Sequence, residues 1–428
     1  MMLKISHKNR ILHFVLAIVM FIYIFSPPLL PINMHIMVEG ISIIYLICII
    51  IKHKGLIILD SKIISLAIAF IPFLIYETIM VIIFSYSNNS FSEAYINSYT
   101  LIMKIWIRIL IACTAYYVFI VENKFDLDEQ LKVYMIVMFI QIFFVFLTFM
   151  FPGVRDAVLN MITTNSSENV IIDVIGRLGD RRGYGLSENL FDSFGFILSL
   201  FLSITYILWL EKGNKIFIFL TIALLVACAL NARTGVLLSI LSIGVATILY
   251  KKKPKQIRNI FIMSIIIPFL IIWIIRILGN IVPDTVDWLR DGMDEIINLF
   301  KYGEYTGTFG GLKEDTFWPQ SLAFGSGAGP ETLVRRSSDV GYVQCVWRYG
   351  IIGTVLLIGG YIYGGCLGIK NASHIWERVL MFIFIILVLI YLLKIFFINN
   401  LGANFVIYTC IIGVLNEQKK EKDFILRS

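Results

Sequence analysis

Long apolar runs dominate this chain of 428 residues and leave few folds open to it. A helix needs about 20 mainly apolar residues to cross the hydrocarbon of a bilayer. Charged residues make up only 15% of the sequence and hydrophobic residues 58%, more apolar surface than a soluble domain of this size could bury. We therefore expect an all-α polytopic membrane protein with about twelve transmembrane helices. The expected spans cover residues 11–32, 35–51, 62–85, 97–121, 131–151, 190–211, 215–231, 234–250, 258–280, 340–366, 378–397 and 401–416.

The lysines indicate which way these spans face. Twelve spans place both termini on one side, and the lysine-bearing turns share that side with the tail. Because cationic loops stay in the cytoplasm, both termini are predicted to be cytoplasmic. This topology and anionic lipid headgroups account for the net charge of +7, so nucleic acid is not indicated as a partner. The lysines concerned are Lys52, Lys54, Lys124, Lys212, Lys251, Lys252, Lys253, Lys255, Lys370, Lys419, Lys420 and Lys422.

Residues 1–428 are expected to form a single integral membrane domain with two long loops on the outer face, 152–189 and 281–339. In the second loop, apolar residues from Val286 to Phe300 recur at helical spacing, which predicts an amphipathic helix at the membrane interface. Its acidic residues, Asp291, Asp294 and Glu295, are typical of the solvated face of such a helix rather than of a metal site. No metal and no cofactor are indicated.

Six arginines fall on the outer side of this layout, where cationic loops are unusual. A guanidinium group stays charged at any working pH and grips phosphate or carboxylate oxygens through two parallel hydrogen bonds. The pattern therefore indicates an anionic, phosphorylated ligand that is handled outside the cytoplasm. The arginines are Arg177, Arg181, Arg182, Arg233, Arg335 and Arg336.

Charged residues also occur inside the expected spans. Glu77 lies midway along the third span, and Lys104 and Arg108 lie four residues apart on the fourth. Isolated charges in the hydrocarbon are costly and usually face the interior of the bundle in pairs. Two interpretations stay open: an ion pair that links the third and fourth spans, or the floor of an anion pocket entered from outside.

Three short segments bring arginines together with glycines, which let a backbone approach a ligand closely. The third, 325–353, also contains a carboxylate, Asp339, eleven positions before Gly350. Its Gly-x-Gly-x-Gly stretch follows no strand and faces outward, which argues against a nucleotide loop. Tyr184, Trp318 and Tyr342 are candidates for stacking on sugar rings or for anchoring at the interface. The other two segments are 177–185 and 231–235.

These motifs resemble those of the O-antigen and capsule polysaccharide polymerases (the Wzy type) and, more distantly, those of the O-antigen ligases. The resemblance covers residues 177–355. Ligases carry a histidine at the position of Asp339, and this difference favours a polymerase. The arginine that the family places before a tryptophan in the second loop is not plain here, where Lys313 is the nearest basic residue before Trp318. The matching residues are Arg182-Gly183-Tyr184-Gly185, Ala232-Arg233-Thr234-Gly235, Gly327, Gly329, Asp339 and Gly350-Ile351-Ile352-Gly353.

The resemblance implies a GT-C-like fold in a bacterial cytoplasmic membrane and metal-independent, inverting glycosyl transfer. Donor and acceptor would both be glycans linked through pyrophosphate to undecaprenol. Asp339 would orient or deprotonate the acceptor hydroxyl, and arginines would stabilise the departing pyrophosphate. The implied catalytic residues are Asp339 and Arg335; the candidate substrate-binding residues are Arg181, Arg182, Arg233, Arg336, Tyr342, Lys104 and Arg108.

Two other functions stay open at this point. One is a ligase-type glycosyltransferase. The other is a flippase or transporter for lipid-linked oligosaccharides, although such proteins show pseudo-repeated halves and short outer loops, which this chain lacks. The sequence does not name the sugar or the linkage, does not separate O-antigen from capsule, and does not say whether a chain-length regulator binds.

Overall fold

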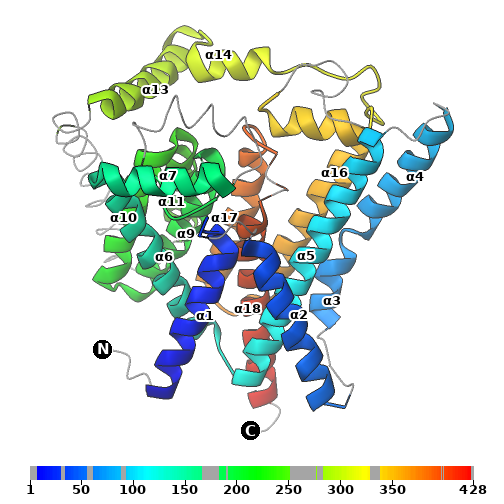
Figure 1. Ribbon diagram of the computed structural model, residues 1–428, viewed down its shortest axis with the longest axis vertical. Coiled ribbons are helices and arrows are strands. Elements are labelled where there is room, and N and C mark those ends of the chain that lie inside the picture. The colour runs from blue at the N-terminus through cyan, green and yellow to red at the C-terminus, as the bar shows by residue number, and fades with distance from the viewer. Residues whose placement is uncertain are drawn as a thin grey trace. The chain divides into compact units, whose positions relative to one another are not determined.

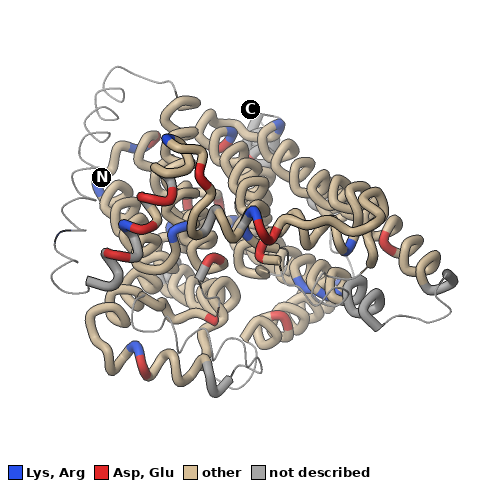
Figure 2. The backbone as a smooth tube through the Cα atoms, turned by 90° about the horizontal axis from the view of Figure 1, so that it is seen from above, with Lys and Arg blue, Asp and Glu red and all other residues tan. Residues whose placement is uncertain are grey.

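The computed structural model describes residues 7–29, 34–54, 61–87, 93–165, 183–188, 191–250, 276, 283–327, 338–396, 398 and 400–425. Within these ranges the secondary structure is helical, with no β-strand (Figure 1). Six helices of this described part are long and apolar enough to cross a membrane. Charged residues are few in the apolar stretches of these helices, and most of the tube in Figure 2 is uncharged. The all-α membrane class expected from the sequence is confirmed at this level.

The expected spans fall on helical structure, with one exception. The exception is 258–280, which lies almost entirely outside the described residues. The span at 62–85 consists of two helices, α3 (Ser61–Ile68) and α4 (Ile71–Ser87). Pro72 has no backbone N–H to continue a helix from α3, which explains the interruption. Four apolar helices are shorter than the six long ones: Ile11–Phe25, Lys215–Asn231, Arg233–Leu249 and Leu401–Glu417. A count of twelve spans therefore stays a prediction.

The chain divides into two compact units, and α6 (Leu127–Met150) contributes to both. The first unit consists of residues 1–26, 32–138 and 315–428. Besides α3 and α4, its helices are α1 (His7–Phe25), α2 (Met34–Lys52), α5 (Glu93–Asn123), α16 (Gly341–Asn371), α17 (Ile375–Tyr391) and α18 (Leu401–Ile425). Within this unit, α5 packs against α2, α4 and α18, and α16 packs against α4, α17 and α18.

The second unit consists of residues 27–31 and 139–314. Its centre is α9 (Phe191–Lys212), which packs against α10 (Lys215–Asn231) and α11 (Arg233–Leu249). The backbones of α9 and α11 nearly touch at Gly195 and Gly235, where an added Cβ on Gly235 would lie 2.9 Å from the Gly195 Cα. Small residues allow such close helix crossings in membranes. Hydroxyl pairs such as Ser203 with Ser242, at 2.6 Å, join the same two helices.

Both segments expected to be long loops contain helices. The first holds α7 (Pro152–Asn165), and the second holds α13 (Pro283–Tyr302) and α14 (Gly307–Glu314). α13 confirms the helix expected from the spacing of Val286 to Phe300. Two residues of its predicted apolar face, Ile297 and Phe300, are exposed. This face of the helix is therefore not covered by the described parts of the protein.

A break in α16 organises one end of the first unit. Gly350 has φ 65° and ψ 179° inside this helix, a combination essentially limited to glycine. The break frees backbone groups that residues 321–327 satisfy: the N–H of Ile351 donates to the Leu322 carbonyl at 2.8 Å and that of Ile352 to the Ala323 carbonyl at 3.2 Å. The residues that seal the break, Leu322 and Ala323, lie directly before the glycine-rich segment 325–353 singled out from the sequence.

The break makes Gly350 a sensitive position. Gly350→Ala should lower the free energy of unfolding by roughly 3 kcal/mol or more, because the backbone strain alone costs about 1–3 kcal/mol and a Cβ would clash with the Ala323 carbonyl oxygen. Gly359→Ala in the same helix is the matched control, since a Cβ there meets nothing within 4 Å. Thermal unfolding in detergent measures both. Equal melting temperatures for the two variants would contradict the conformation at Gly350.

Candidate functional site

Arg233 lies in the second unit at the tight junction between α10 and α11. Ala232 is extended and ends α10, so Arg233 is the first residue of α11. Its Nη1 donates to Glu295 Oε1 at 3.0 Å, and the two side chains keep 21% and 14% of their surface exposed. The loop-side arginine predicted to bind phosphate is thus held by a carboxylate of α13.

This pair corrects the expectation for the acidic residues of α13. Asp291 and Asp294 are exposed, as expected of a solvated face, but Glu295 is not part of that face. Gly292 explains how α13 approaches so closely: a Cβ at this position would lie 2.8 Å from the Cδ of Arg233. The absence of a side chain at Gly292 makes room for the arginine stem.

The segment that follows Arg182 in the chain is bonded to the same end of α10. The Gly183 N–H donates to the Leu230 carbonyl at 2.9 Å, and Asn231 Nδ2 donates to the Gly183 carbonyl at 3.1 Å. The Thr148 hydroxyl donates to the Tyr184 carbonyl. The described part of one arginine-bearing motif, at Gly183, is therefore a neighbour in space of the other, at Asn231. Arg177, Arg181 and Arg182 themselves lie outside the described residues.

Tyr184 is buried, with 1% of its surface exposed. It cannot stack on a sugar in this structure, so that expectation is corrected. Trp318 is 49% exposed and stays available for such a role. Tyr342 is half-buried, and its hydroxyl donates to the Leu389 carbonyl at 2.9 Å. This hydrogen bond joins α16 to α17.

Asp339 lies in the first unit, directly before α16. The start of this helix is fastened to the end of α17, because the Tyr342 N–H also donates to the Leu392 carbonyl at 3.0 Å. This contact brings Lys394 close: its Nζ is 3.8 Å from Asp339 Oδ2. The carboxylate is 71% exposed and the ammonium 21%. Among the described residues, Asp339 is therefore an accessible carboxylate beside one cation, Lys394.

The arginines expected around Asp339, Arg335 and Arg336, lie outside the described residues. The cation that the structure places next to the carboxylate is Lys394, which sequence reasoning missed. The signal for it was weak, since a lysine at the end of an apolar run usually anchors a helix at the interface. The neighbouring Ser338 is tied down, with its hydroxyl donating to the Asp315 carbonyl at 2.8 Å.

The charged residues inside the first unit pair differently from the prediction. Arg108 Nε donates to both oxygens of Glu39, each at 2.9 Å, and the Tyr23 hydroxyl donates to Glu39 Oε1 at 3.4 Å. The pair links α5 to α2, so the proposed pairing with Glu77 is wrong. Lys104 is exposed, and the Nε of Arg108 is taken up by Glu39. Glu39 was overlooked because it lies early in the second apolar run.

Glu77 remains buried on α4, and its Oε1 has no hydrogen-bond partner within the described residues. This difference between the two glutamates can be tested. Glu39→Gln should lower the free energy of unfolding by about 2–3 kcal/mol, because it leaves the Arg108 charge uncompensated. Glu77→Gln should leave stability unchanged or raise it slightly. Melting curves in the same detergent compare the two, and a larger loss for Glu77→Gln would contradict the assignment.

Comparison of the chain with models of known families, with curated proteins and with solved structures finds no match. Its function must therefore be argued from its own residues. Those residues form two groups, one in each unit: Arg233 with Glu295 and the Gly183 segment, and Asp339 with Lys394 at the start of α16.

Proposed function

We propose that this protein is a polysaccharide polymerase that joins undecaprenyl-pyrophosphate-linked repeat units on the outer face of a bacterial cytoplasmic membrane. The observation that carries the proposal is Asp339: a carboxylate that stays 71% exposed directly before an apolar helix long enough to span a membrane. An accessible carboxylate at a membrane surface can accept a hydrogen bond from a sugar hydroxyl.

In the proposed reaction, an acceptor sugar hydroxyl attacks the anomeric carbon of the donor with inversion. A new glycosidic C–O bond forms while the bond from the anomeric carbon to the pyrophosphate oxygen breaks. The hydroxyl proton goes to Asp339 or to solvent, and undecaprenyl pyrophosphate leaves with the bonding electrons. Asp339 orients the attacking hydroxyl, and the Lys394 ammonium lies beside this carboxylate, with its Nζ 3.8 Å from Asp339 Oδ2.

Negative charge grows on the departing pyrophosphate, and an arginine fork can stabilise it without a metal. Arg233 is the described candidate. Its carboxylate partner, Glu295, accepts from Nη1 through one oxygen at 3.0 Å, so the guanidinium already holds an oxygen anion. We propose that the pyrophosphate replaces Glu295 there. Arg182 would join it, because the segment that follows Arg182 is bonded to the end of α10.

The α16 break bears on the transporter alternative. In transporters, helix breaks leave backbone groups that bind the substrate or its coupling ion. Here the freed N–H groups of Ile351 and Ile352 bond to carbonyls of residues 322–323, and the Trp347 carbonyl accepts from the Ser326 N–H at 2.7 Å. These backbone groups are therefore already hydrogen-bonded within the protein and are not left for a substrate or an ion, which favours an enzyme over a transporter. The proposal retains about twelve spans and cytoplasmic termini.

Asp339→Asn should leave the protein folded and sharply reduce chain extension. The asparagine amide fits the same space, but its oxygen is a weaker hydrogen-bond acceptor for the hydroxyl of the acceptor sugar. It also cannot take the proton of that hydroxyl. Cells with this variant should display single repeat units in place of long chains, because export and attachment continue through other proteins. Gel analysis of surface polysaccharide measures the chain length.

Asp287→Asn is the matched control, since Asp287 is also an exposed carboxylate, 67% accessible, but lies on α13. It should leave chain length unchanged. Long chains with stably expressed Asp339→Asn would sink the catalytic assignment. Accumulation of long polymer on the lipid carrier would favour a ligase, and lipid-linked units trapped inside would favour a flippase.

A further inference from the structure

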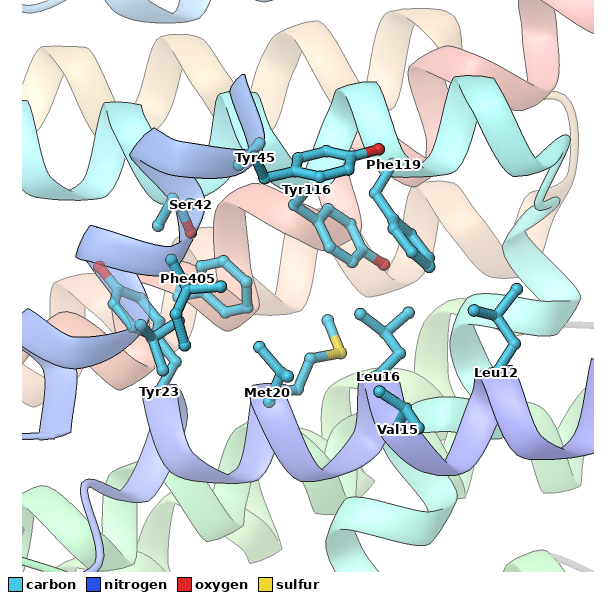
Figure 3. Close-up of a pocket in the computed structure, with 15 residues that line it drawn as sticks. Leu12, Val15, Leu16, Met20, Tyr23, Ser42, Tyr45, Tyr116, Phe119 and Phe405 are labelled. Atoms are coloured by element: carbon cyan, nitrogen blue, oxygen red, sulfur yellow. The ribbon is translucent and has the colours of Figure 1, made fainter. Parts of the chain in front are cut away.

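An apolar slot of about 210 Å³ lies inside the first unit, between α1, α2, α5 and α18. α1 forms one wall along the length of the slot, and Tyr45, Tyr116 and Phe119 face it from the other side (Figure 3). From Leu12 to Tyr23 the α1 wall is about 16 Å long at 1.5 Å per residue. The lining is mostly hydrocarbon, and its polar side-chain groups are the hydroxyls of Ser42, Tyr23, Tyr45 and Tyr116.

The two ends of the slot differ. At the Tyr23 end the side chains are buried and the Tyr23 hydroxyl bonds to the Glu39–Arg108 pair, so this end is closed. Between the ends the slot opens sideways from the unit, because its lining residues Val15 and Ile41 are 51% and 50% exposed. An apolar ligand dissolved in the membrane could therefore enter it laterally.

The other end leads to a cationic cluster where α2 and α5 end. Glu122 accepts hydrogen bonds from Lys52 Nζ at 3.0 Å and from the Tyr45 hydroxyl at 3.3 Å, and His53 Nε2 lies 2.9 Å from it. Lys54 is exposed beside them. Two lysines against one glutamate leave positive charge at this end. Lys52 keeps 63% of its side chain exposed, so it can reach a second anion.

We propose that the slot holds one acyl chain of a membrane phospholipid, whose phosphate binds at Lys52 and Lys54. Half of the roughly 30 Å hydrocarbon core of a bilayer is about 15 Å, which matches the length of the slot. A phosphate beside the lysines therefore places a single acyl chain of one leaflet along α1. A polyprenyl chain is far longer and would overrun the closed Tyr23 end. This site is independent of the proposed polymerase reaction.

Photo-crosslinking tests the proposal on the full-length protein. It is reconstituted in vesicles of phosphatidylethanolamine and phosphatidylglycerol that contain a phosphatidylglycerol with a diazirine in one acyl chain. Illumination should attach the lipid to peptides of α1 and α5 that line the slot, such as those containing Met20 and Ala115. Mass spectrometry locates the adducts. Ser42→Phe fills the slot and should reduce this labelling about tenfold, equal to about 1.4 kcal/mol of binding.

Cys48→Phe is the matched control, because Cys48 has a side chain of nearly the same size on the same helix but is exposed. Its slot labelling should equal that of the wild type. If Ser42→Phe does not fold, the smaller change Ala115→Leu tests the same space. Lys52→Gln combined with Lys54→Gln should reduce labelling several-fold through loss of the phosphate contacts.

Unchanged slot labelling in a folded, slot-filled variant would overturn the proposal. A competition experiment gives a second way to overturn it. If unlabelled polyprenyl phosphate displaces the probe but excess unlabelled phosphatidylglycerol does not, the slot holds a polyprenyl chain and the proposal is wrong.

Discussion

A bilayer leaves no water to satisfy a free backbone group, so an interrupted helix within it must be completed by other parts of the protein. This constraint explains the end of the first unit. Gly350 breaks α16, and the carbonyls of residues 322–323 replace the lost helical partners. Because a Cβ on Gly325 would clash with the Gly350 N–H, both glycines are needed for the fit. The start of the same helix then carries Asp339 beside Lys394.

A second constraint governs the arginines. A guanidinium that is partly withdrawn from water is costly unless it is paired, and both described candidates have a carboxylate partner, Glu39 for Arg108 and Glu295 for Arg233. The two pairs differ in consequence. Arg108 joins α2 to α5 through its Nε, which donates to both oxygens of Glu39. Arg233 is held by a helix that belongs to a predicted outer loop, and there we propose that a ligand with more negative charge competes with Glu295.

Much of the fold could be predicted from the sequence, because hydropathy over about 20 residues is a strong signal. The helix at 283–302 was equally predictable from its apolar spacing. Pairing between helices was not, since Glu39 and Glu77 both look like isolated carboxylates in apolar runs and only packing decides which one meets Arg108. The proximity of Gly183 to Asn231 and the burial of Tyr184 both depend on tertiary contacts that no local pattern reveals.

The most direct test of the central claim is polymerisation by the purified protein in liposomes. The substrate is the lipid-linked saccharide that accumulates in cells from which the gene has been deleted. The account predicts a ladder of lipid-linked products that differ by one repeat unit, made in the presence of a metal chelator, and a much weaker ladder with Arg233→Lys, which keeps the charge but loses the bidentate fork. Folded wild-type protein that consumes this substrate without forming a ladder, or leaves it unchanged, would contradict the account.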